Sequence, residues 1–390
     1  MNNVKQIFII FFSFKILILL IGFLYHNLQL QLIHFEHLAT EDIQFNDIYY
    51  ATKQYKNSEF KSKEVVLVNT GSLANDDLFR ENLAELIDKV ALNKPKAIGL
   101  DFYFPTTKNP VNDSILRDKI IKNNVVTVID AKQNHKSIFI SDKKGLMNFP
   151  GKNKETIREY YNYKIINNDT IPSFAAVLSN TKSKDTLSYL KYSTENKGYY
   201  NILNKNEKIN PVNFPAIEAS DFFNESYQNE LNQIIKNKIV IIGHLGIGNM
   251  HNPFDTEDKF RVPTDKSLFN RDLTMPGSVI HANAVQMLLN KDEMISIDGW
   301  YYEIITSIIL LIYLFLFYYI HHKFHLSKLI NVILILASTF PIVYICCVYL
   351  MDIGIYYKVG GLFGLIIFLE EFIEIYEGFV NKFNKKNNEN

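Results

Sequence analysis

The stretch Asn237–Gly246, which reads NKIVIIGHLG, decides the fold of this 390-residue chain. Its apolar part, Ile239–Ile242, consists entirely of β-branched residues and ends at Gly243. A short apolar run of this kind, bounded by polar residues and glycine, predicts a strand that is buried on both faces. Strands buried in this way are typical of parallel sheets that helices cover on both sides.

Three further runs have the same character, namely Val65–Val68, Ala97–Leu100 and Val125–Ile129. Apolar residues at helical spacing separate them, over Asp76–Leu92 and Ser114–Lys122. The order strand, helix, strand, helix, strand predicts an α/β domain with a mainly parallel sheet and right-handed crossovers.

The rest of this region is less regular. Lys132–Asn210 has weak periodicity, which favours an insertion or antiparallel strands. Gly246–Met275 is polar and is predicted to be a long loop. A turn at Pro276 and Gly277 then leads to apolar residues at helical spacing over Val279–Leu289, which predicts one more amphipathic helix.

Composition excludes several classes of protein. Lys plus Arg and Asp plus Glu both number 41, so net charge gives no reason to expect a nucleic-acid partner. The two cysteines, Cys346 and Cys347, are adjacent in an apolar run near the C-terminus. The region between the apolar ends therefore holds neither a disulfide nor a thiolate metal site.

Apolar residues are concentrated at the two ends of the chain, which predicts four transmembrane helices. A helix of about 20 apolar residues crosses the hydrocarbon core. The four stretches are Ile7–Tyr25, Tyr302–Ile320, Leu329–Leu350 and Ile353–Leu369. Lys15 lies near the centre of the first, where it extends toward the interface or pairs with Glu370 or Glu371. No small-residue cleavage site follows this stretch, so we expect an uncleaved anchor.

Lysines in short loops set the orientation. The loop 322–328 is basic and the tail 374–390 carries Lys382, Lys385 and Lys386, so both belong in the cytoplasm and the large middle region lies outside. The predicted organisation is an N-terminus and anchor over 1–26, an extracytoplasmic domain over 27–298, and transmembrane helices over 299–321, 329–350 and 353–373.

Five patches of the chain carry a family resemblance. They are 41–45 (EDIQF), 65–72 (VVLVNTGS), 97–104 (AIGLDFYF), 237–246 (NKIVIIGHLG) and 275–289 (MPGSVIHANAVQMLL). Together they resemble the second type of CHASE domain, an extracytoplasmic sensory module of bacterial histidine kinases and nucleotide cyclases. One span before the domain and three after it is also the arrangement of that family. The chain departs from the pattern at Asn69, where the family usually has an acidic residue. It departs again before Arg80, where NDDLF replaces a turn with Trp-Pro.

The resemblance implies a sensor in the bacterial cytoplasmic membrane, with its domain on the periplasmic or extracellular side and an unknown ligand. The tail after Glu374 is too short for a kinase or cyclase, so we expect a separate cytoplasmic kinase or cyclase as partner. An apolar stripe continues from Leu369 to Val380, which suits a partner helix, a homodimer or an interfacial helix end. The alternative function is an envelope scaffold whose outer domain docks another envelope protein.

Ligands of parallel α/β sheets bind at the carboxyl ends of the strands. Asn69, Asp101 and Asp130 fall at or near such ends. With Ser72 and His244, they are the candidate ligand-binding residues. For Asp101, the competing interpretation is a structural carboxylate that accepts hydrogen bonds from loop amides.

Two groups of residues resemble functional motifs only in part. GHLGIG at 243–248 follows a strand as a phosphate loop does, but no helical pattern and no Lys-Ser/Thr follows it, which favours a tight glycine turn. A second group offers imidazole and carboxylate ligands at a spacing that matches no metal motif: His244, His251, Asp255, Asp258 and His281. A metal-dependent hydrolase would need the three histidines to converge. We therefore expect no enzyme, no metal and no cofactor.

Overall fold

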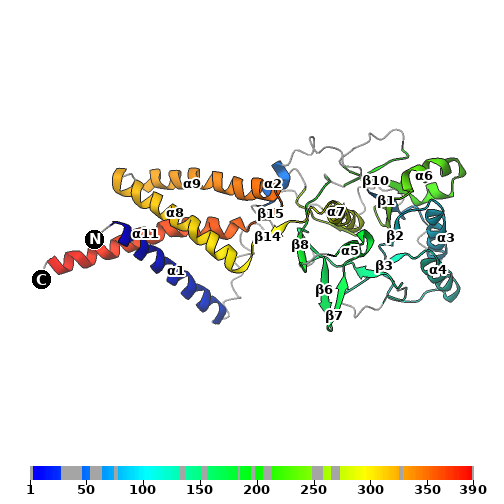
Figure 1. The fold of residues 1–390 in the computed structure, drawn as a ribbon, viewed down its shortest axis with the longest axis horizontal. Coiled ribbons are helices and arrows are strands. Elements are labelled where there is room, and N and C mark those ends of the chain that lie inside the picture. Colours follow the sequence, from blue (N-terminus) through cyan, green and yellow to red (C-terminus); the bar gives the residue numbers. More distant parts are fainter. Residues whose placement is uncertain are drawn as a thin grey trace. The chain divides into compact units, whose positions relative to one another are not determined.

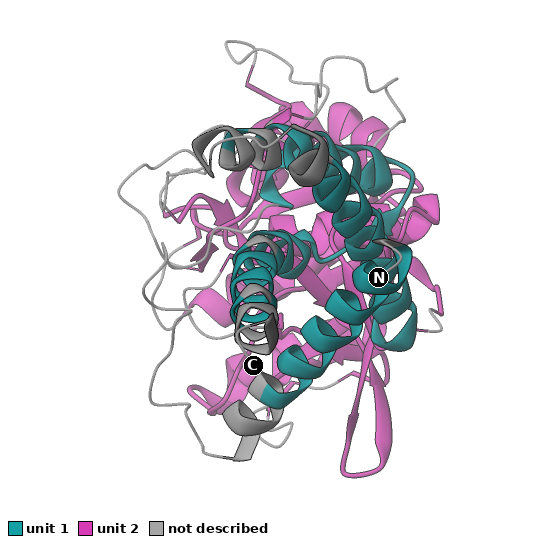
Figure 2. Ribbon diagram, turned by 90° about the vertical axis from the view of Figure 1, so that its left-hand side faces the viewer, with its two compact units in different colours: residues 1–49, 296–390 teal, residues 50–295 magenta. Residues whose placement is uncertain are grey.

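The computed structural model describes residues 3–27, 46–52, 64–73, 78–131, 137–139, 141–150, 156–182, 185–194, 198–204, 213–247, 258–264, 273–324 and 328–388. The chain, whose ribbon is drawn in Figure 1, forms two compact units, which Figure 2 shows in different colours. Unit 1 comprises residues 1–49 and 296–390, and unit 2 comprises residues 50–295. The predicted family patch at 41–45 lies outside the described residues.

Unit 2 is built on a seven-stranded sheet with the order β4-β3-β2-β11-β1-β10-β9. All six neighbouring pairs are parallel. The strands are β1 (Val65–Asn69), β2 (Ala97–Leu100), β3 (Val126–Ile129), β4 (Lys144–Leu146), β9 (Tyr199–Asn201), β10 (Phe214–Glu218) and β11 (Ile239–Gly243). The predicted α/β fold with a mainly parallel sheet is confirmed.

The last strand in sequence occupies the centre of this sheet. β11 pairs with β1 on one side, with Val65 opposite Ile239, and with β2 on the other, with Ala97 opposite Ile239. Every residue of β1 and β11 is buried, which explains the unbroken aliphatic sequences of Val65–Val68 and Ile239–Ile242. This order brings the chain segments that follow β1, β2 and β11 to one edge of the sheet.

Helices cover both faces of the sheet (Figure 1). On one side lie α3 (Phe79–Leu92), α4 (Pro110–Lys122) and α6 (Gln228–Ile235), which share a hydrophobic core with alternate strand residues such as Val66 and Val68. On the other side lie α5 (Phe174–Ser179) and α7 (Gly277–Asn290). α7 is buried from Gly277 to Leu288, so the predicted amphipathic helix has no broad exposed face.

α4 begins four residues before the predicted start at Ser114. Asn109 is its N-cap, because the Asn109 side chain accepts a hydrogen bond from Val111 N at 3.0 Å. Pro110 occupies the first helical position, where its missing N–H costs nothing.

The region 132–210 contains strands of the main parallel sheet and separate antiparallel strand pairs. β4 and β9 extend the main sheet in parallel. The expected antiparallel strands are also present: β5 (Glu159–Tyr161) pairs with β8 (Leu187–Tyr189), and β6 (Tyr163–Ile166) pairs with β7 (Asp169–Pro172). The smaller elements of the chain are α2 (Asp47–Thr52), η4 (Ala219–Phe223), η5 (Glu225–Tyr227), β12 (Lys259–Phe260), β13 (Met275–Pro276) and β14 (Ile295–Ser296).

Unit 1 consists mainly of helices. They are α1 (Asn3–Asn27), α8 (Gly299–Phe324), α9 (Lys328–Tyr344), a π-helical turn (Ile345–Tyr349), α10 (Leu350–Asp352) and α11 (Val359–Asn388), with β15 at Ile355–Tyr356. Among the described residues, one helix is long and apolar enough to cross a membrane, namely Gly299–Tyr319 with a mean hydropathy of 1.9. The count of four spans stays a prediction.

The predicted helix over 353–373 starts too early. Gly354 has a φ of 84° and Ile355–Tyr356 is extended, so α11 begins at Val359. The pairing of Lys15 also differs from the two expected partners. Its ammonium lies 3.5 Å from a carboxylate oxygen of Glu303 in α8, where the side chain of Lys15 is only 22% exposed.

Candidate functional site

A pocket of about 680 Å³ lies in unit 2 at the carboxyl ends of β1, β2 and β11. We call it the strand-end pocket. Its lining consists of residues that follow these three strands, the start of α3, and two residues from elsewhere: Thr70, Gly71, Leu73, Phe79, Arg80, residues 101–106, Lys108, Met147, His244, Ile247 and Asp258. The pocket therefore occupies the edge where parallel α/β sheets bind ligands.

Asp101 contributes a largely buried carboxylate to this pocket. Its side chain is 10% exposed. Oδ2 accepts a hydrogen bond from Ser278 Oγ at 2.7 Å, and Oδ1 lies 3.8 Å from His281 Nε2. The backbone N–H of Asp101 donates to Ile242 O at 2.9 Å. Asp101 thus joins the end of β2 to β11 and to the first turn of α7.

His281 is neutral at physiological pH. Its side chain is 2% exposed and packs against the rings of Phe149 and Phe174, with centroid distances of 4.7 and 5.2 Å. Burial lowers the pKa of His281, and the nearby Asp101 and the Met147 backbone offset this effect only in part. Its Nδ1 is buried and has no hydrogen-bond partner among the described residues. The contact between Asp101 and His281 is therefore not an ion pair.

Asn69 holds the loops beside the pocket together. It is fully buried, and its Oδ1 accepts hydrogen bonds from Gly71 N at 3.1 Å and Leu245 N at 2.9 Å. Its Nδ2 donates to Glu218 Oε2 at 2.8 Å and to Gly246 O at 3.1 Å. One side chain thus connects the ends of β1, β10 and β11.

The glycines of this edge permit close approach of the backbone. A Cβ on Gly71 would lie 1.6 Å from Gly246 O, and one on Gly243 would lie 2.0 Å from Ser278 Oγ. The amides of Leu245 and Gly246 point at Asn69 Oδ1, so neither is available to cradle a phosphate. This geometry agrees with a glycine turn rather than a phosphate loop.

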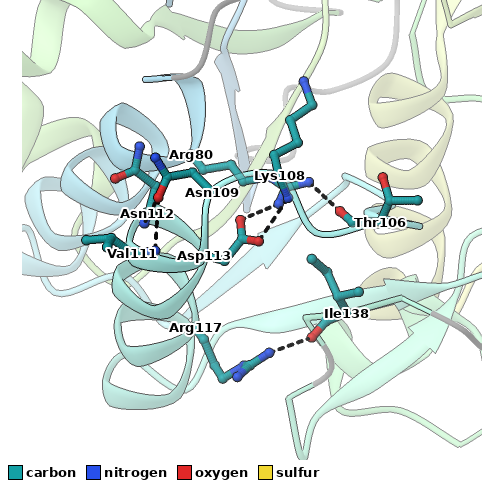
Figure 3. A network of polar contacts seen from close by, with 9 residues as sticks. All are labelled: Arg80, Thr106, Lys108, Asn109, Val111, Asn112, Asp113, Arg117 and Ile138. Carbon is teal, nitrogen blue, oxygen red and sulfur yellow. Dashed lines mark hydrogen bonds and ion pairs between the residues drawn. The ribbon is translucent and has the colours of Figure 1, made fainter.

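Arg80, which lines the pocket, belongs to an ion pair whose contacts are shown in Figure 3. Arg80 Nη1 of α3 pairs with Asp113 Oδ1 of α4, and both side chains are 6% exposed. Arg80 Nη2 donates to Thr106 O at 2.7 Å, and Lys108 N donates to Asp113 Oδ2 at 3.1 Å. The guanidinium also lies 5.3 Å from the ring centroid of Phe104. The pair fixes the segment that follows β2. Sequence reasoning missed it, because no local signal relates residues 33 positions apart.

The family model of the CHASE2 domain matches residues 16–317, which is most of the chain. The chain belongs to the CHASE2 family. CHASE2 is an extracytoplasmic sensory domain of bacteria, so unit 2 lies within a sensory module. No curated protein and no solved structure matches the chain. The family match begins within α1 and ends within α8, beyond both limits of the predicted domain 27–298.

The CHASE2 fold brings two of the five candidate residues to the pocket, Asp101 and His244. The other three lie outside its lining. Asn69 is saturated by the contacts above, and Ser72 Oγ accepts a hydrogen bond from Ser220 N at 3.3 Å. Asp130 is buried and accepts a hydrogen bond from Asn148 Nδ2 at 2.9 Å.

The suggested metal group is divided in this CHASE2 domain. His251 and Asp255 lie outside the described residues. His244 and Asp258 line the pocket, whereas His281 is buried beside Asp101. Within the described ranges, no three His, Cys, Asp or Glu side chains are placed to hold a metal ion.

Proposed function

We propose that this protein is a membrane-anchored sensor. In this proposal, a small molecule binds in the strand-end pocket, and its binding is passed through the helices of unit 1 to a separate cytoplasmic partner. The observation that carries the proposal is the pocket itself, which lies at the carboxyl edge of the central strands of a CHASE2 domain. Its mixture of aromatic walls and a few convergent polar groups is typical of small-molecule sites.

Exposed apolar side chains support the membrane anchor. Large apolar residues point outward on four helices of unit 1, for example Leu19 of α1, Ile312 of α8, Phe340 of α9 and Ile375 of α11. Exposure of so much apolar surface to water is unfavourable, by about 25 cal/mol for each Å². Lipid removes this cost, so we propose four spans with both termini in the cytoplasm of a bacterium.

The chain connections between the two units support the proposed transmission of a signal. The chain passes between the units at residues 49–50 and 295–296, next to the segments that lead to α1 and α8. Within unit 1, Phe14 of α1 packs against Phe368 and Phe372 of α11, with centroid distances of 5.7 and 5.3 Å. A signal requires two packing arrangements of these helices that differ in ligand affinity. α11 extends to Asn388 and is the segment that we assign to contact the cytoplasmic kinase or cyclase.

Thermal unfolding of the full chain in lipid nanodiscs tests the binding step. The probes are a panel of small amines, carboxylates and sugars. Each is compared on the wild type and on Ile247→Trp, a variant designed to obstruct the pocket. Ile247 lines the pocket and is 48% exposed, so an indole there narrows the pocket without disturbing the core. We expect at least one probe to raise the unfolding midpoint of the wild type but not of the variant. Equal responses in both proteins would contradict binding in this pocket.

Crosslinking of the tail tests the transmission step. The same probe should change the crosslinks that form over residues 377–386, read by mass spectrometry. An unchanged pattern, with binding established, would contradict transmission through α11.

A scaffold that docks an envelope protein is the second candidate function. The observation that favours it is the β6–β7 hairpin, which projects from the rest of unit 2 (Figure 1). The side chain of Ile165 in this hairpin is exposed. Co-purification of an envelope protein that Ile165→Lys abolishes, without saturation by any small molecule, would favour this function over sensing.

A further inference from the structure

Asp101 is a largely buried carboxylate without a matching cation. The structure places no lysine or arginine nitrogen of the described residues within 4 Å of its carboxylate, and its neighbour His281 is neutral. Ser278 supplies one hydrogen bond. A carboxylate offers about four lone-pair positions, so Asp101 retains the capacity to accept more.

The other charges around the pocket leave this one uncompensated. Arg80 is neutralised by Asp113. The ammonium of Lys108 is exposed, and Asp258 adds a second, exposed carboxylate. The N-terminus of α7, whose second residue is Ser278, offers about half a positive charge. That partial charge is shared with Asp258, whose carboxylate lies near Gly277.

An aromatic wall stands beside this carboxylate. Phe79, Phe102 and Phe104 form a continuous row, with ring centroids 5.7 and 6.1 Å apart. All three line the pocket, together with Leu73 and Ile247. Aromatic faces attract cations as well as apolar groups, so the wall and the carboxylate favour the same kind of molecule.

We propose that the strand-end pocket binds an organic amine: its ammonium group contacts Asp101 and its apolar body lies on the row of Phe79, Phe102 and Phe104. This inference rests on the proposed function, since it names the chemical class that the sensory pocket takes. Charge-assisted hydrogen bonds to a desolvated carboxylate are among the strong ones, which makes the ammonium the decisive group of the ligand.

Three probes of similar size test this inference: 2-phenylethylamine, 2-phenylethanol and 3-phenylpropanoate. Their binding to the full chain in nanodiscs is measured by titration calorimetry. We expect the amine to bind at least about tenfold more tightly than the alcohol, and the carboxylate to bind most weakly. Asp101→Asn keeps an acceptor for Ser278 but removes the charge. It should weaken amine binding about tenfold and leave alcohol binding unchanged.

Two controls separate a local effect from a general one. Asp118→Asn makes the same change in net charge on an exposed position of α4 and should bind the amine as the wild type does. Ser278→Ala keeps the charge of Asp101 and should also retain the preference for the amine. If Asp101→Asn does not fold, the order of the three probes on the wild type still decides the inference.

Tighter binding of the alcohol or the carboxylate, binding of none of the three probes, or equal amine binding by Asp101→Asn and the wild type would overturn the inference. The proposed function has a separate test. It fails if no member of the panel of amines, carboxylates and sugars raises the unfolding midpoint of the wild type more than that of Ile247→Trp.

Discussion

Asn69 donates a hydrogen bond from Nδ2 to Glu218 Oε2 at 2.8 Å, which links the carboxyl ends of β1 and β10. The same side chain accepts a hydrogen bond from Leu245 N, which holds the turn after β11. The Asn69 amide meets both demands, whereas a carboxylate has acceptors alone at neutral pH. An acidic residue at this position would face Glu218 with like charge.

Asn69→Asp should therefore destabilise unit 2 by about 3 kcal/mol, since it loses two donated hydrogen bonds and buries a charge without a partner. Chemical unfolding of the full chain measures the change. Asn109→Asp is the matched control, because Asn109 only accepts hydrogen bonds at the N-cap of α4, where Asp is as good a cap. Equal stability of the two variants would disprove the role assigned to Asn69.

Arg80→Met should cost about 3–5 kcal/mol, because it leaves the buried carboxylate of Asp113 without its partner. Arg80→Met combined with Asp113→Leu removes both charges and should recover much of that loss. Urea unfolding of the wild type, the single variants and the double variant gives the coupling between the two sites. Additive losses would mean that the pair does not act as a unit.

His281 should make unit 2 less stable in acid. Burial lowers its pKa in the folded state, so the unfolded chain takes up a proton first as the pH falls below about 6.5. The contribution of neutral His281 is present in full above that pH and is lost as the pH falls toward the lowered pKa, with a slope of at most about 1.4 kcal/mol per pH unit.

The measurement for this prediction is the unfolding free energy at pH 7.5 and pH 5.5 for the wild type and His281→Gln. The variant should lose less stability between the two pH values. A wild-type curve that is no steeper than that of the variant would show that His281 does not titrate in this window.

The proposed topology predicts which cysteines react from outside the cell. In a background with Cys346→Ser and Cys347→Ser, Lys182→Cys should react with a membrane-impermeant maleimide in intact cells, because position 182 is exposed in unit 2. Gly378→Cys in α11 should react only after the cells are permeabilised. Reaction of both cysteines in intact cells would exclude a cytoplasmic tail.

The sequence by itself determined the central strands, the α/β class and the edge at which the site lies. Val65–Val68 and Ile239–Ile242 are apolar at every position, and this continuity records burial on both faces. The positions of Asp101 and His244 directly after two such strands were sufficient to place them at the carboxyl edge, where both line the pocket.

Tertiary structure alone decided how these pieces meet. The insertion of β11 between β1 and β2 juxtaposes segments more than 130 residues apart. The same strand order places Asn69 where its side chain binds the turn after β11. It places Asp101 in the lining of the pocket. Likewise, the pairing of Arg80 with Asp113 depends on the contact between α3 and α4. The physical reason is that local periodicity reports whether a residue is buried, whereas the identity of its partner depends on contacts between segments remote in sequence.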